Sequence, residues 1–348
     1  MRAIEIERPG GPEVLRMVDV PRPRPGAGEV VIRVVAAGVN RPDIQQRRGL
    51  YPPPPGASPL PGLDVAGVIE EVGKGAGSLK AGDAVCALVN GGGYAEYCSV
   101  PAVQCMPIPH GLTFAEGASL PEVFFTAWNN IIWLGRLAHR ETLLIQGGTS
   151  GVGLASIQIA RHLRDATVLA TAGTARKRKV CLKAGAHYAI DYHGDWQGEV
   201  IRATDGKGVD VVLDAQAGSY TQKQLDLLKP DGRLVLIASH LGETAEVNIR
   251  AIVRRRLTLT GSTLRPQPAS YKGAIAAELV RHVWPLIEAG RITTRIHALF
   301  PWEQVRDAHD LLDRNEQIGK VVLLVDAERA RNIPERTTAQ PEASDADR

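Results

Sequence analysis

The sequence predicts an α/β protein of two domains: a β-rich module and a doubly wound parallel sheet. Three observations lead to this fold class. The chain has 348 residues, more than one hydrophobic core usually serves. Residues 1–120 contain short β-branched runs bounded by glycine or proline. From about residue 121 onward, strand and helix patterns alternate, which is typical of βαβ units.

The β-rich module begins with an alternating, charged stretch at the start of the chain that predicts a strand. Further β-branched runs follow at 29–39, 64–73 and 82–89. Two loops, "RPRPGAGE" and "YPPPPGASPLPG", are punctuated by proline. The second loop cannot be helical and lacks several backbone donors, so we expect it at the surface or along a cleft.

The alternating block opens with the helical spacing of "EVFFTAWNNIIWLG". Strands are then expected in "TLLIQG", "ATVLATAG", "GVDVVLDAQ", "RLVLIAS" and "LTLTGST", with helices between the earlier ones. The helix pattern of "YKGAIAAELVRHVWPLIEAG" and the β pattern that ends in "GKVVLLV" predict a return to the first domain. The expected boundaries are 1–122 with 264–325 for the β-rich domain, 123–263 for the parallel-sheet domain, and 326–348 for a polar, disordered tail.

Composition excludes several classes of partner. The net charge of +3 is too small to indicate nucleic acid or an anionic membrane surface. We find no long uncharged apolar run and no signal-peptide pattern at the first residues. The four cysteines form no Cys-x-x-Cys pair, so we expect free, buried thiols in a reducing cytoplasm.

The glycine-rich stretch "GGTSGVG" lies between an expected strand and an expected helix. Glycines there let the backbone approach a pyrophosphate, and a helix N-terminus offers free N–H groups. Taken alone, the turn is equally compatible with a plain strand-to-helix connection. The candidate contacts are Gly148, Thr149, Ser150, Gly151, Val152 and Gly153.

The next expected strand indicates which dinucleotide the turn would hold. It ends without the Asp or Glu that binds a ribose 2′-hydroxyl in NAD-specific sites, and it runs into "TARKRK". Cations without a nearby carboxylate suit a 2′-phosphate, so NADPH is the predicted cofactor. Lys177 is the candidate for that contact, beside Gly173 and Thr174, and Tyr192 follows the next strand. The alternative for "TARKRK" is a solvated helix face.

With these residues identified, the chain resembles the quinone oxidoreductase group of the medium-chain dehydrogenases/reductases. Within that group it is most similar to the p53-inducible quinone oxidoreductase branch. The segments that carry the resemblance include "AAGVNRPDIQQRRGLYPPPPGAS", "PGLDVAGVIEEVG", "GGTSGVGLASIQIA", "TAGTARK" and "QIGKVVLLV", in that order along residues 1–325. The resemblance implies a GroES-like β-rich catalytic domain and a Rossmann nucleotide-binding domain.

Zinc-dependent members of this family carry a Cys and a Gly-His-Glu as ligands, and this sequence departs from both. Asn40 stands where the Cys would be, and Leu63 and Asp64 stand where His and Glu would be. Because zinc needs three or four donors, no metal site is predicted.

Hydride transfer without a metal suits an electron-poor acceptor, because a quinone or conjugated carbonyl spreads the negative charge over its own π-system. Tyr51 is the candidate that hydrogen-bonds the acceptor and helps to protonate the product; the alternative is a tyrosine that only shapes the pocket. Asn40 and Ser150 are the other two candidate catalytic residues. Asn40 is expected to bond the nicotinamide ribose or the substrate, and Ser150 the cofactor or the substrate.

The resemblance also places Thr126, Ala238, Ser239 and Leu264 near the nicotinamide. At Asp214–Gly218 the sequence "DAQAG" departs from the glycine pair that is frequent in the family, which leaves Gln216 without a defined role.

Three functions remain open at this stage. The first is an NADPH:quinone oxidoreductase, the second an NADPH-dependent enoyl or 2-alkenal reductase, and the third an NADPH-binding structural or sensor protein. The β-rich run at 257–263 is expected to be an edge strand that pairs with a second copy. The resemblance implies a homodimer through that edge, with a homotetramer as the further possibility.

Overall fold

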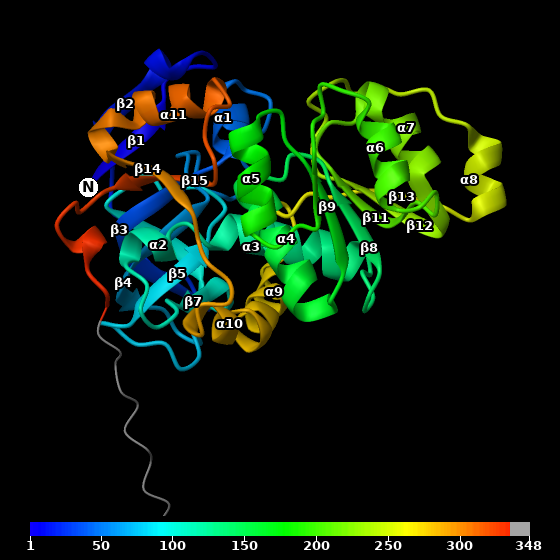
Figure 1. The fold of residues 1–348 in the computed structure, drawn as a ribbon. Coiled ribbons are helices and arrows are strands. Elements are labelled where there is room, and N and C mark those ends of the chain that lie inside the picture. Colours follow the sequence, from blue (N-terminus) through cyan, green and yellow to red (C-terminus); the bar gives the residue numbers. More distant parts are fainter. Residues whose placement is uncertain (335–348) are drawn as a thin grey trace, which may run out of the picture.

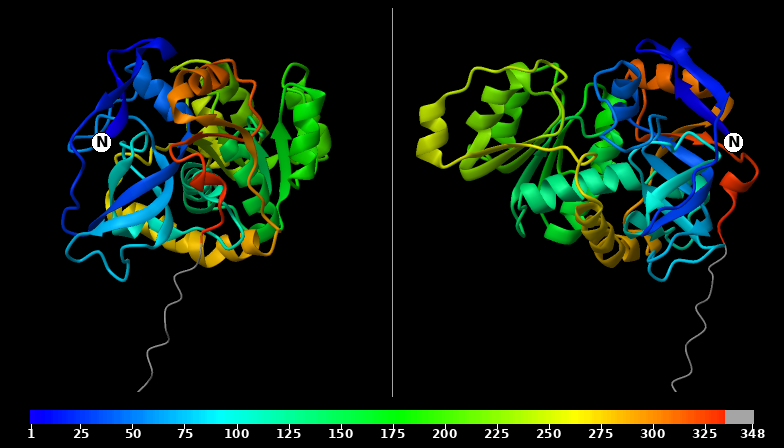
Figure 2. Two further views of the ribbon diagram at one scale, coloured as in Figure 1. Left: turned by 90° about the vertical axis from the view of Figure 1, so that its left-hand side faces the viewer. Right: turned by 180° about the vertical axis from the view of Figure 1, so that it is seen from behind.

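The computed structural model describes residues 1–334, which form two domains side by side (Figure 1). One domain contains a seven-stranded sheet and a two-stranded hairpin, and the other contains a six-stranded sheet. Seen from behind, the six-stranded sheet and its helices extend away from the first domain (Figure 2).

The first domain is built around β3, an eleven-residue strand that is buried along most of its length. β15 pairs with β3 in antiparallel register, with Val321 opposite Val39, so the C-terminal part of the chain does return to this domain. The strands are β1 Arg2–Ile6, β2 Leu15–Asp19, β3 Glu29–Val39, β4 Asp64–Val72, β5 Ala84–Leu88, β6 Tyr97–Pro101, β7 Cys105–Pro107, β14 Ile296–Pro301 and β15 Lys320–Leu324.

The second domain is a parallel sheet of order β10-β9-β8-β11-β12-β13. The chain runs outward from β8 to β10 and resumes on the other side of β8 with β11, so the order reverses between these two strands. This is the Rossmann order, in which ligands bind at the carboxyl edge beside the reversal. The strands are β8 Thr142–Ile145, β9 Thr167–Thr171, β10 Tyr188–Ile190, β11 Val209–Asp214, β12 Leu228–Leu236 and β13 Thr258–Gly261.

Helices cover both sheets and join the domains. The helices of the parallel-sheet domain are α4 Gly151–Arg164, α5 Ala175–Lys183, α6 Trp196–Ala203, α7 Thr221–Leu227 and α8 Ile249–Arg255. The others are α1 Arg41–Arg47, α2 Phe114–Gly117, α3 Pro121–Ala127, α9 Ala269–His282, α10 Trp284–Glu288 and α11 Val305–Asp313. One hydrophobic core includes residues of α3, α4 and α9 and runs through the junction between the domains. The two domains are therefore held together by packed apolar side chains.

Two local expectations differ from the structure. The helical pattern that begins near residue 122 is α-helical only to Ala127 and continues as a π-helical turn, Trp128–Leu134. The predicted disordered tail begins too early, because residues 326–334 are described and Ala330 is fully buried. The carbonyl of Asn332 also accepts a hydrogen bond from the Phe114 N–H. The rest of that predicted tail lies outside the described residues.

The four cysteines are free thiols. Cys86, Cys98 and Cys181 are buried, as expected, whereas Cys105 is half-buried. Burial raises the pKa of the Cys98 and Cys181 thiols to about 12, so neither is a reactive thiolate at neutral pH. None of the helices in residues 1–334 is long and apolar enough to cross a membrane.

Candidate active site

The glycine-rich turn connects β8 to α4. At three of its positions there is no room for a side chain. A Cβ at Gly153 would lie 2.5 Å from the carbonyl oxygen of Gly147, and one at Gly148 would lie 2.7 Å from the Cβ of Ala170. A Cβ at Gly151 would lie 2.7 Å from a methyl group of Val123. Only glycine therefore lets α4 begin this close to the sheet. The N–H groups at the start of a helix have no partner within the helix, and they point toward an anion bound at its N-terminus.

Ser150 is the N-cap of α4. Its hydroxyl accepts a hydrogen bond from the Gly153 N–H at 3.0 Å and donates to the Gly147 carbonyl at 2.9 Å. The hydroxyl thus has a structural partner on both sides, and it is exposed at the carboxyl edge. The catalytic role expected for Ser150 stays a prediction.

The remaining predicted cofactor residues lie at the same edge, because the carboxyl ends of parallel strands meet there. Gly148–Gly153, including Thr149 and Val152, follow β8; Gly173, Thr174 and Lys177 follow β9; Tyr192 follows β10; Ala238 and Ser239 follow β12; and Leu264 follows β13. Thr126 comes from α3 and Asn40 from the start of α1, across the cleft.

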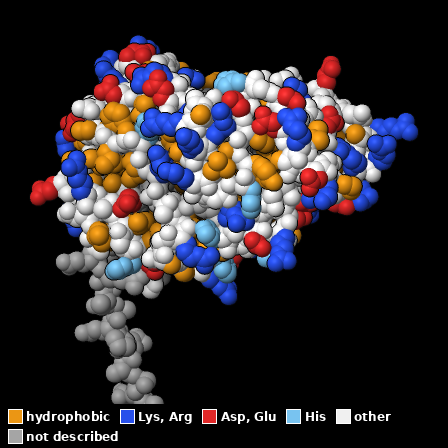
Figure 3. Space-filling view, viewed as in Figure 1, with side chains coloured by type: hydrophobic (Ala, Val, Ile, Leu, Met, Phe, Trp, Pro, Cys, Tyr) orange, Lys and Arg blue, Asp and Glu red, His pale blue; other side chains and the backbone are white. Residues whose placement is uncertain are grey.

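The residues after β9 and β10 meet at the carboxyl edge of the sheet. A Cβ at Gly173 would lie 2.5 Å from the Tyr192 hydroxyl, so the two residues are in close contact. Arg178 is paired with Asp191 at 2.6 Å, whereas the Lys177 ammonium donates only to the Asn315 carbonyl at 2.9 Å. Within residues 1–334 no carboxylate lies within 4 Å of Lys177. The basic side chains of α5 gather on one face of the molecule (Figure 3).

Across the cleft, Asn40, Asp64 and Lys320 form a buried cluster from the ends of three separate strands. The Lys320 ammonium is 2.7 Å from Oδ2 of Asp64 and is also hydrogen-bonded to the Asn40 amide oxygen. The Asn40 amide nitrogen donates to the same Asp64 oxygen at 2.9 Å, and the Glu122 N–H donates to the other at 2.5 Å. Both oxygens of Asp64 therefore already have donors, and a fixed positive charge lies beside them.

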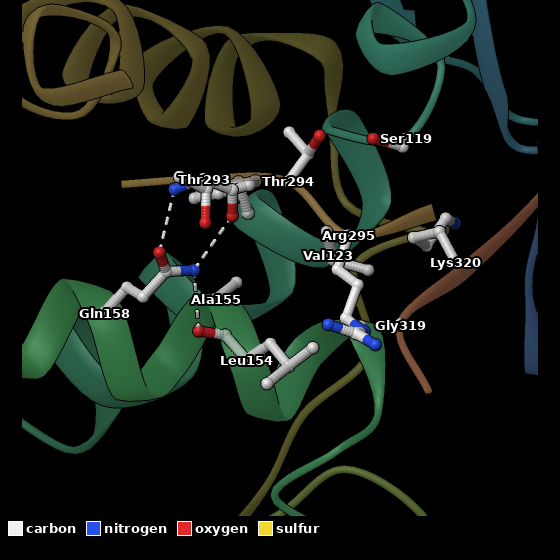
Figure 4. Close-up of a pocket in the computed structure, with 12 residues that line it drawn as sticks. Ser119, Val123, Leu154, Ala155, Gln158, Thr293, Thr294, Arg295, Gly319 and Lys320 are labelled. Carbon is white, nitrogen blue, oxygen red and sulfur yellow. Dashed lines mark hydrogen bonds between the residues drawn. The ribbon is translucent and has the colours of Figure 1, made fainter. Parts of the chain in front are cut away.

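This cluster is held against the glycine turn. The N–H of Gly319, directly before Lys320, donates to the Thr149 carbonyl at 2.9 Å. The two segments also line a small cavity, in which the Gln158 side chain binds the backbone N–H and carbonyl of Thr293 (Figure 4). These bonds fix the distance between the two sides of the cleft.

Asp43 holds the backbone at Asn40 and Gly62, next to the Asn40–Asp64–Lys320 cluster. The sequence analysis did not predict a role for it. Its carboxylate accepts hydrogen bonds from the Asn40 N–H, the Gly62 N–H and the Tyr94 hydroxyl. Burial is the main cause that raises the pKa of Asp43 to about 6. Asp43 therefore orients the backbone of Asn40.

Tyr51 lies in the proline loop and is anchored at both ends of its side chain. The hydroxyl shares a hydrogen bond with the Thr263 hydroxyl at 3.0 Å, and the Arg265 guanidinium lies 5.4 Å from the ring centroid. Burial raises the pKa of Tyr51 above its ordinary value. The loop is partly exposed along residues 51–60, in agreement with the expected surface position.

Arg265 and Lys272 are two buried cations near Tyr51. The sequence analysis did not identify either as a candidate site residue. Arg265 donates to the carbonyl of Asn90 and to the Gln46 amide oxygen, and Lys272 donates to the Asn90 side chain at 2.7 Å. Neither has a carboxylate partner within ion-pair distance among residues 1–334. Burial lowers the pKa of Lys272 to about 8.

Comparison with known proteins agrees with this architecture. Residues 26–110 match the model of the alcohol dehydrogenase GroES-like domain, and residues 151–279 match that of the zinc-binding dehydrogenases. The chain is 36% identical to the quinone oxidoreductase of Lama guanicoe over 329 residues, which cover 93% of this chain and 98% of that one. This chain belongs to the quinone oxidoreductase group of the medium-chain dehydrogenases/reductases.

Other relatives of this group carry different names. The synaptic vesicle membrane protein VAT-1 homolog of Rattus norvegicus is 32% identical over 94% of this chain and 85% of its own. Escherichia coli quinone oxidoreductase, solved in complex with NADPH, has a TM-score of 0.82 at 28% identity, over 93% of this chain and all of that chain. The CurK enoyl reductase has a TM-score of 0.81 at 25% identity, over 93% and 98% of the two chains. The family assignment makes the protein an oxidoreductase with a nicotinamide cofactor.

Proposed function

We propose that the protein is an NADPH-dependent reductase that transfers hydride to a quinone without a metal ion. The observation that carries the proposal is the Asn40–Asp64–Lys320 cluster opposite the glycine turn. An ammonium group 2.7 Å from the Asp64 carboxylate repels a divalent cation and occupies donors that a metal would need. The chemistry then suits an acceptor that stabilises negative charge by itself.

Different residues would bind the cofactor and the acceptor. Bound NADPH would supply the hydride. The free N–H groups of α4 and the Lys177 ammonium would hold the cofactor's phosphates, and Asn40 would orient the nicotinamide ribose. Tyr51 would hydrogen-bond a carbonyl oxygen of the acceptor. Arg265 would stabilise negative charge that develops there, because its guanidinium carries no carboxylate partner in residues 1–334.

Reduction of an enoyl or 2-alkenal compound is the second candidate function, supported by the structural likeness to the CurK enoyl reductase. Both reactions need the same cofactor contacts and a donor near the acceptor carbonyl. An NADPH-binding structural or sensor role is the third.

Acceptor profiling separates these three functions. Stopped-flow measurement of NADPH oxidation would compare 1,2-naphthoquinone, 1,4-benzoquinone and a 2-alkenal side by side. We expect both quinones to be reduced with kcat/KM at least tenfold above that of the alkenal. A preference for the alkenal would support the enoyl reductase, and tight NADPH binding without turnover of any acceptor would support the third function.

We also propose that two copies pair through β13 in a cytoplasmic homodimer. β13 is the outermost strand of the six-stranded sheet, and its Leu259 side chain is 40% exposed. An edge strand with an exposed apolar side chain pairs readily with a second copy.

A further inference from the structure

A second cavity, of about 340 Å³, lies outside the glycine turn and the Asn40–Asp64–Lys320 cluster. Its walls come from three segments: the π-helical turn Trp128–Leu134, the end of β13 with the residues that follow it, and the first turn of α9. Its size is that of a small-molecule pocket, and π-helical turns are frequent at functional sites. We call it the β13 cavity.

The lining of the β13 cavity is polar but carries no charge. Apart from Leu134 and Gly261, all of its lining residues bear a hydroxyl or an amide group. The polar residues are Asn129, Ser262, Thr263, Gln267 and Tyr271. Thr263 is exposed, and Gln267 and Tyr271 are half-buried, so a ligand can enter from solvent. A charged ligand would find no counter-ion here, whereas an uncharged group with hydrogen-bonding atoms fits the lining.

A directed chain of hydrogen bonds ends at the Ser262 hydroxyl. The Tyr271 hydroxyl donates to the Asn129 amide oxygen at 2.6 Å, and the Asn129 amide nitrogen donates to the Ser262 oxygen at 3.0 Å. Because Ser262 is the acceptor in this chain, its own proton remains available, and it has no acceptor within residues 1–334. The chain therefore presents a hydrogen-bond donor at the wall of the cavity.

The Gln267 side chain is a second group with unused hydrogen-bonding capacity. Its backbone N–H donates to the Leu264 carbonyl at 3.0 Å, which holds the residue in place. Its side-chain amide has no hydrogen-bond partner in the part of the chain that the structure describes. An amide offers both a donor and an acceptor. Ser262 and Gln267 together can therefore bind an oxygen atom and also accept the proton of a hydroxyl group.

Thr263 connects the β13 cavity to Tyr51. Thr263 lines the cavity, and its hydroxyl lies 3.0 Å from the Tyr51 hydroxyl in a shared hydrogen bond. Arg265 holds the same loop, because its guanidinium donates to the Tyr51 carbonyl at 3.3 Å. An acceptor whose carbonyl oxygen is bonded to Tyr51 would therefore have the cavity next to it, on the other side of Thr263.

We propose that the β13 cavity binds a side arm of the acceptor, an uncharged substituent that ends in a hydroxyl or carbonyl oxygen. The inference rests on the proposed reductase function and names the class of acceptor, a quinone with a neutral, oxygen-bearing arm. Ser262 donates to the oxygen of the arm, and Gln267 donates to it or accepts from it. Leu134 contacts the apolar part of the arm.

The test compares two acceptors whose arms have the same length and differ only in the last group. They are 2-methyl-3-(4-hydroxybutyl)-1,4-naphthoquinone and 2-methyl-3-pentyl-1,4-naphthoquinone. The wild type should reduce the first with a kcat/KM about tenfold higher, the effect of one or two hydrogen bonds between neutral groups. Both acceptors are measured on one enzyme preparation, so the ratio does not depend on the fraction of folded enzyme.

The variants test whether the preference arises in the β13 cavity. Gln267→Leu removes the amide without breaking a side-chain hydrogen bond in residues 1–334, and it should lower the preference to about threefold. The double variant Ser262→Ala/Gln267→Leu should abolish the preference. Gln304→Leu is the matched control, because Gln304 is exposed, follows β14 in the first domain, and also has no side-chain partner in the described residues. It should keep the wild-type preference.

The outcomes separate this inference from the reductase function. Equal kcat/KM values for the two acceptors in the wild type overturn the side-arm site and leave the reductase function standing. A preference that survives in the double variant overturns its assignment to the β13 cavity. Loss of a dimer in Gln267→Leu, measured by analytical ultracentrifugation, with an unchanged preference shows that a second copy covers the cavity, which also overturns the site. A wild-type enzyme that reduces neither acceptor nor 1,4-naphthoquinone overturns the reductase function, and the side-arm site with it.

Discussion

The two sides of the cleft are constructed differently. The cofactor side consists mainly of backbone groups from one turn, residues 147–153, in which glycines allow close approach. The proposed acceptor side consists of side chains that are far apart in the sequence, from Asn40 and Asp64 to Arg265 and Lys320. The comparison teaches that the proposed phosphate-binding site is formed by neighbouring residues, whereas the proposed acceptor site is assembled from distant residues by the fold.

The two sides also differ in what they bury. The glycine turn consists of neutral groups, of which the Gly147 carbonyl and the Gly153 N–H are bonded to the Ser150 hydroxyl. The acceptor side buries the charged groups Asp64, Lys320, Arg265 and Lys272, each at most 5% exposed. Burying a charge is costly unless a partner compensates it, so the acceptor side should be the more sensitive to single substitutions.

The largest effect is expected for Lys320→Met on the acceptor side. The substitution leaves the Asp64 carboxylate buried without its cation, which typically costs about 3–5 kcal/mol. Urea denaturation would measure the free energy of unfolding. The double variant Asp64→Asn/Lys320→Met should recover more than half of the loss, and Lys223→Met at the surface serves as a control. If Lys320→Met lowers the free energy of unfolding by less than about 1 kcal/mol, the acceptor side is not the more sensitive side to single substitutions.

A smaller effect is expected for Lys177→Glu on the cofactor side. Loss of a charge-assisted contact to the 2′-phosphate should weaken NADPH binding about ten- to a hundredfold and leave NADH binding nearly unchanged. Isothermal titration calorimetry with both cofactors would measure this. Lys183→Glu at the other end of α5 is the matched control. Equal weakening of NADPH and NADH would show that Lys177 does not contact the 2′-phosphate.

The smallest effect is expected for Ala217→Gly, which follows β11 at the carboxyl edge. Ala217 has φ +54° and ψ −146°, a conformation that glycine adopts far more easily than alanine. Relief of this strain exceeds the added entropy of glycine in the unfolded chain, so we expect stabilisation of about 1 kcal/mol. Thermal unfolding would measure it, with Ala215→Gly as a control that should destabilise. A lower melting temperature for Ala217→Gly would contradict the assigned strain.

Much of the fold follows from local sequence patterns. The alternating strand and helix signals after residue 121 predict the parallel sheet, and "QIGKVVLLV" predicts the strand that returns to the first domain. The π-helical turn Trp128–Leu134 and the packing of residues 326–334 were not predicted. Both depend on contacts with distant parts of the chain, and hydrophobic periodicity carries no information about such contacts.

The sequence by itself determined the glycine turn, the missing acid after β9 and the cations of α5, because a turn and a helix start are decided by neighbouring residues. Only the tertiary structure showed that Lys320 meets Asn40 and Asp64, and that the Glu122 N–H bonds to the same Asp64 carboxylate. These contacts depend on the burial of charged groups that the fold brings together. They exist only after distant segments have packed, so they are a property of the folded protein.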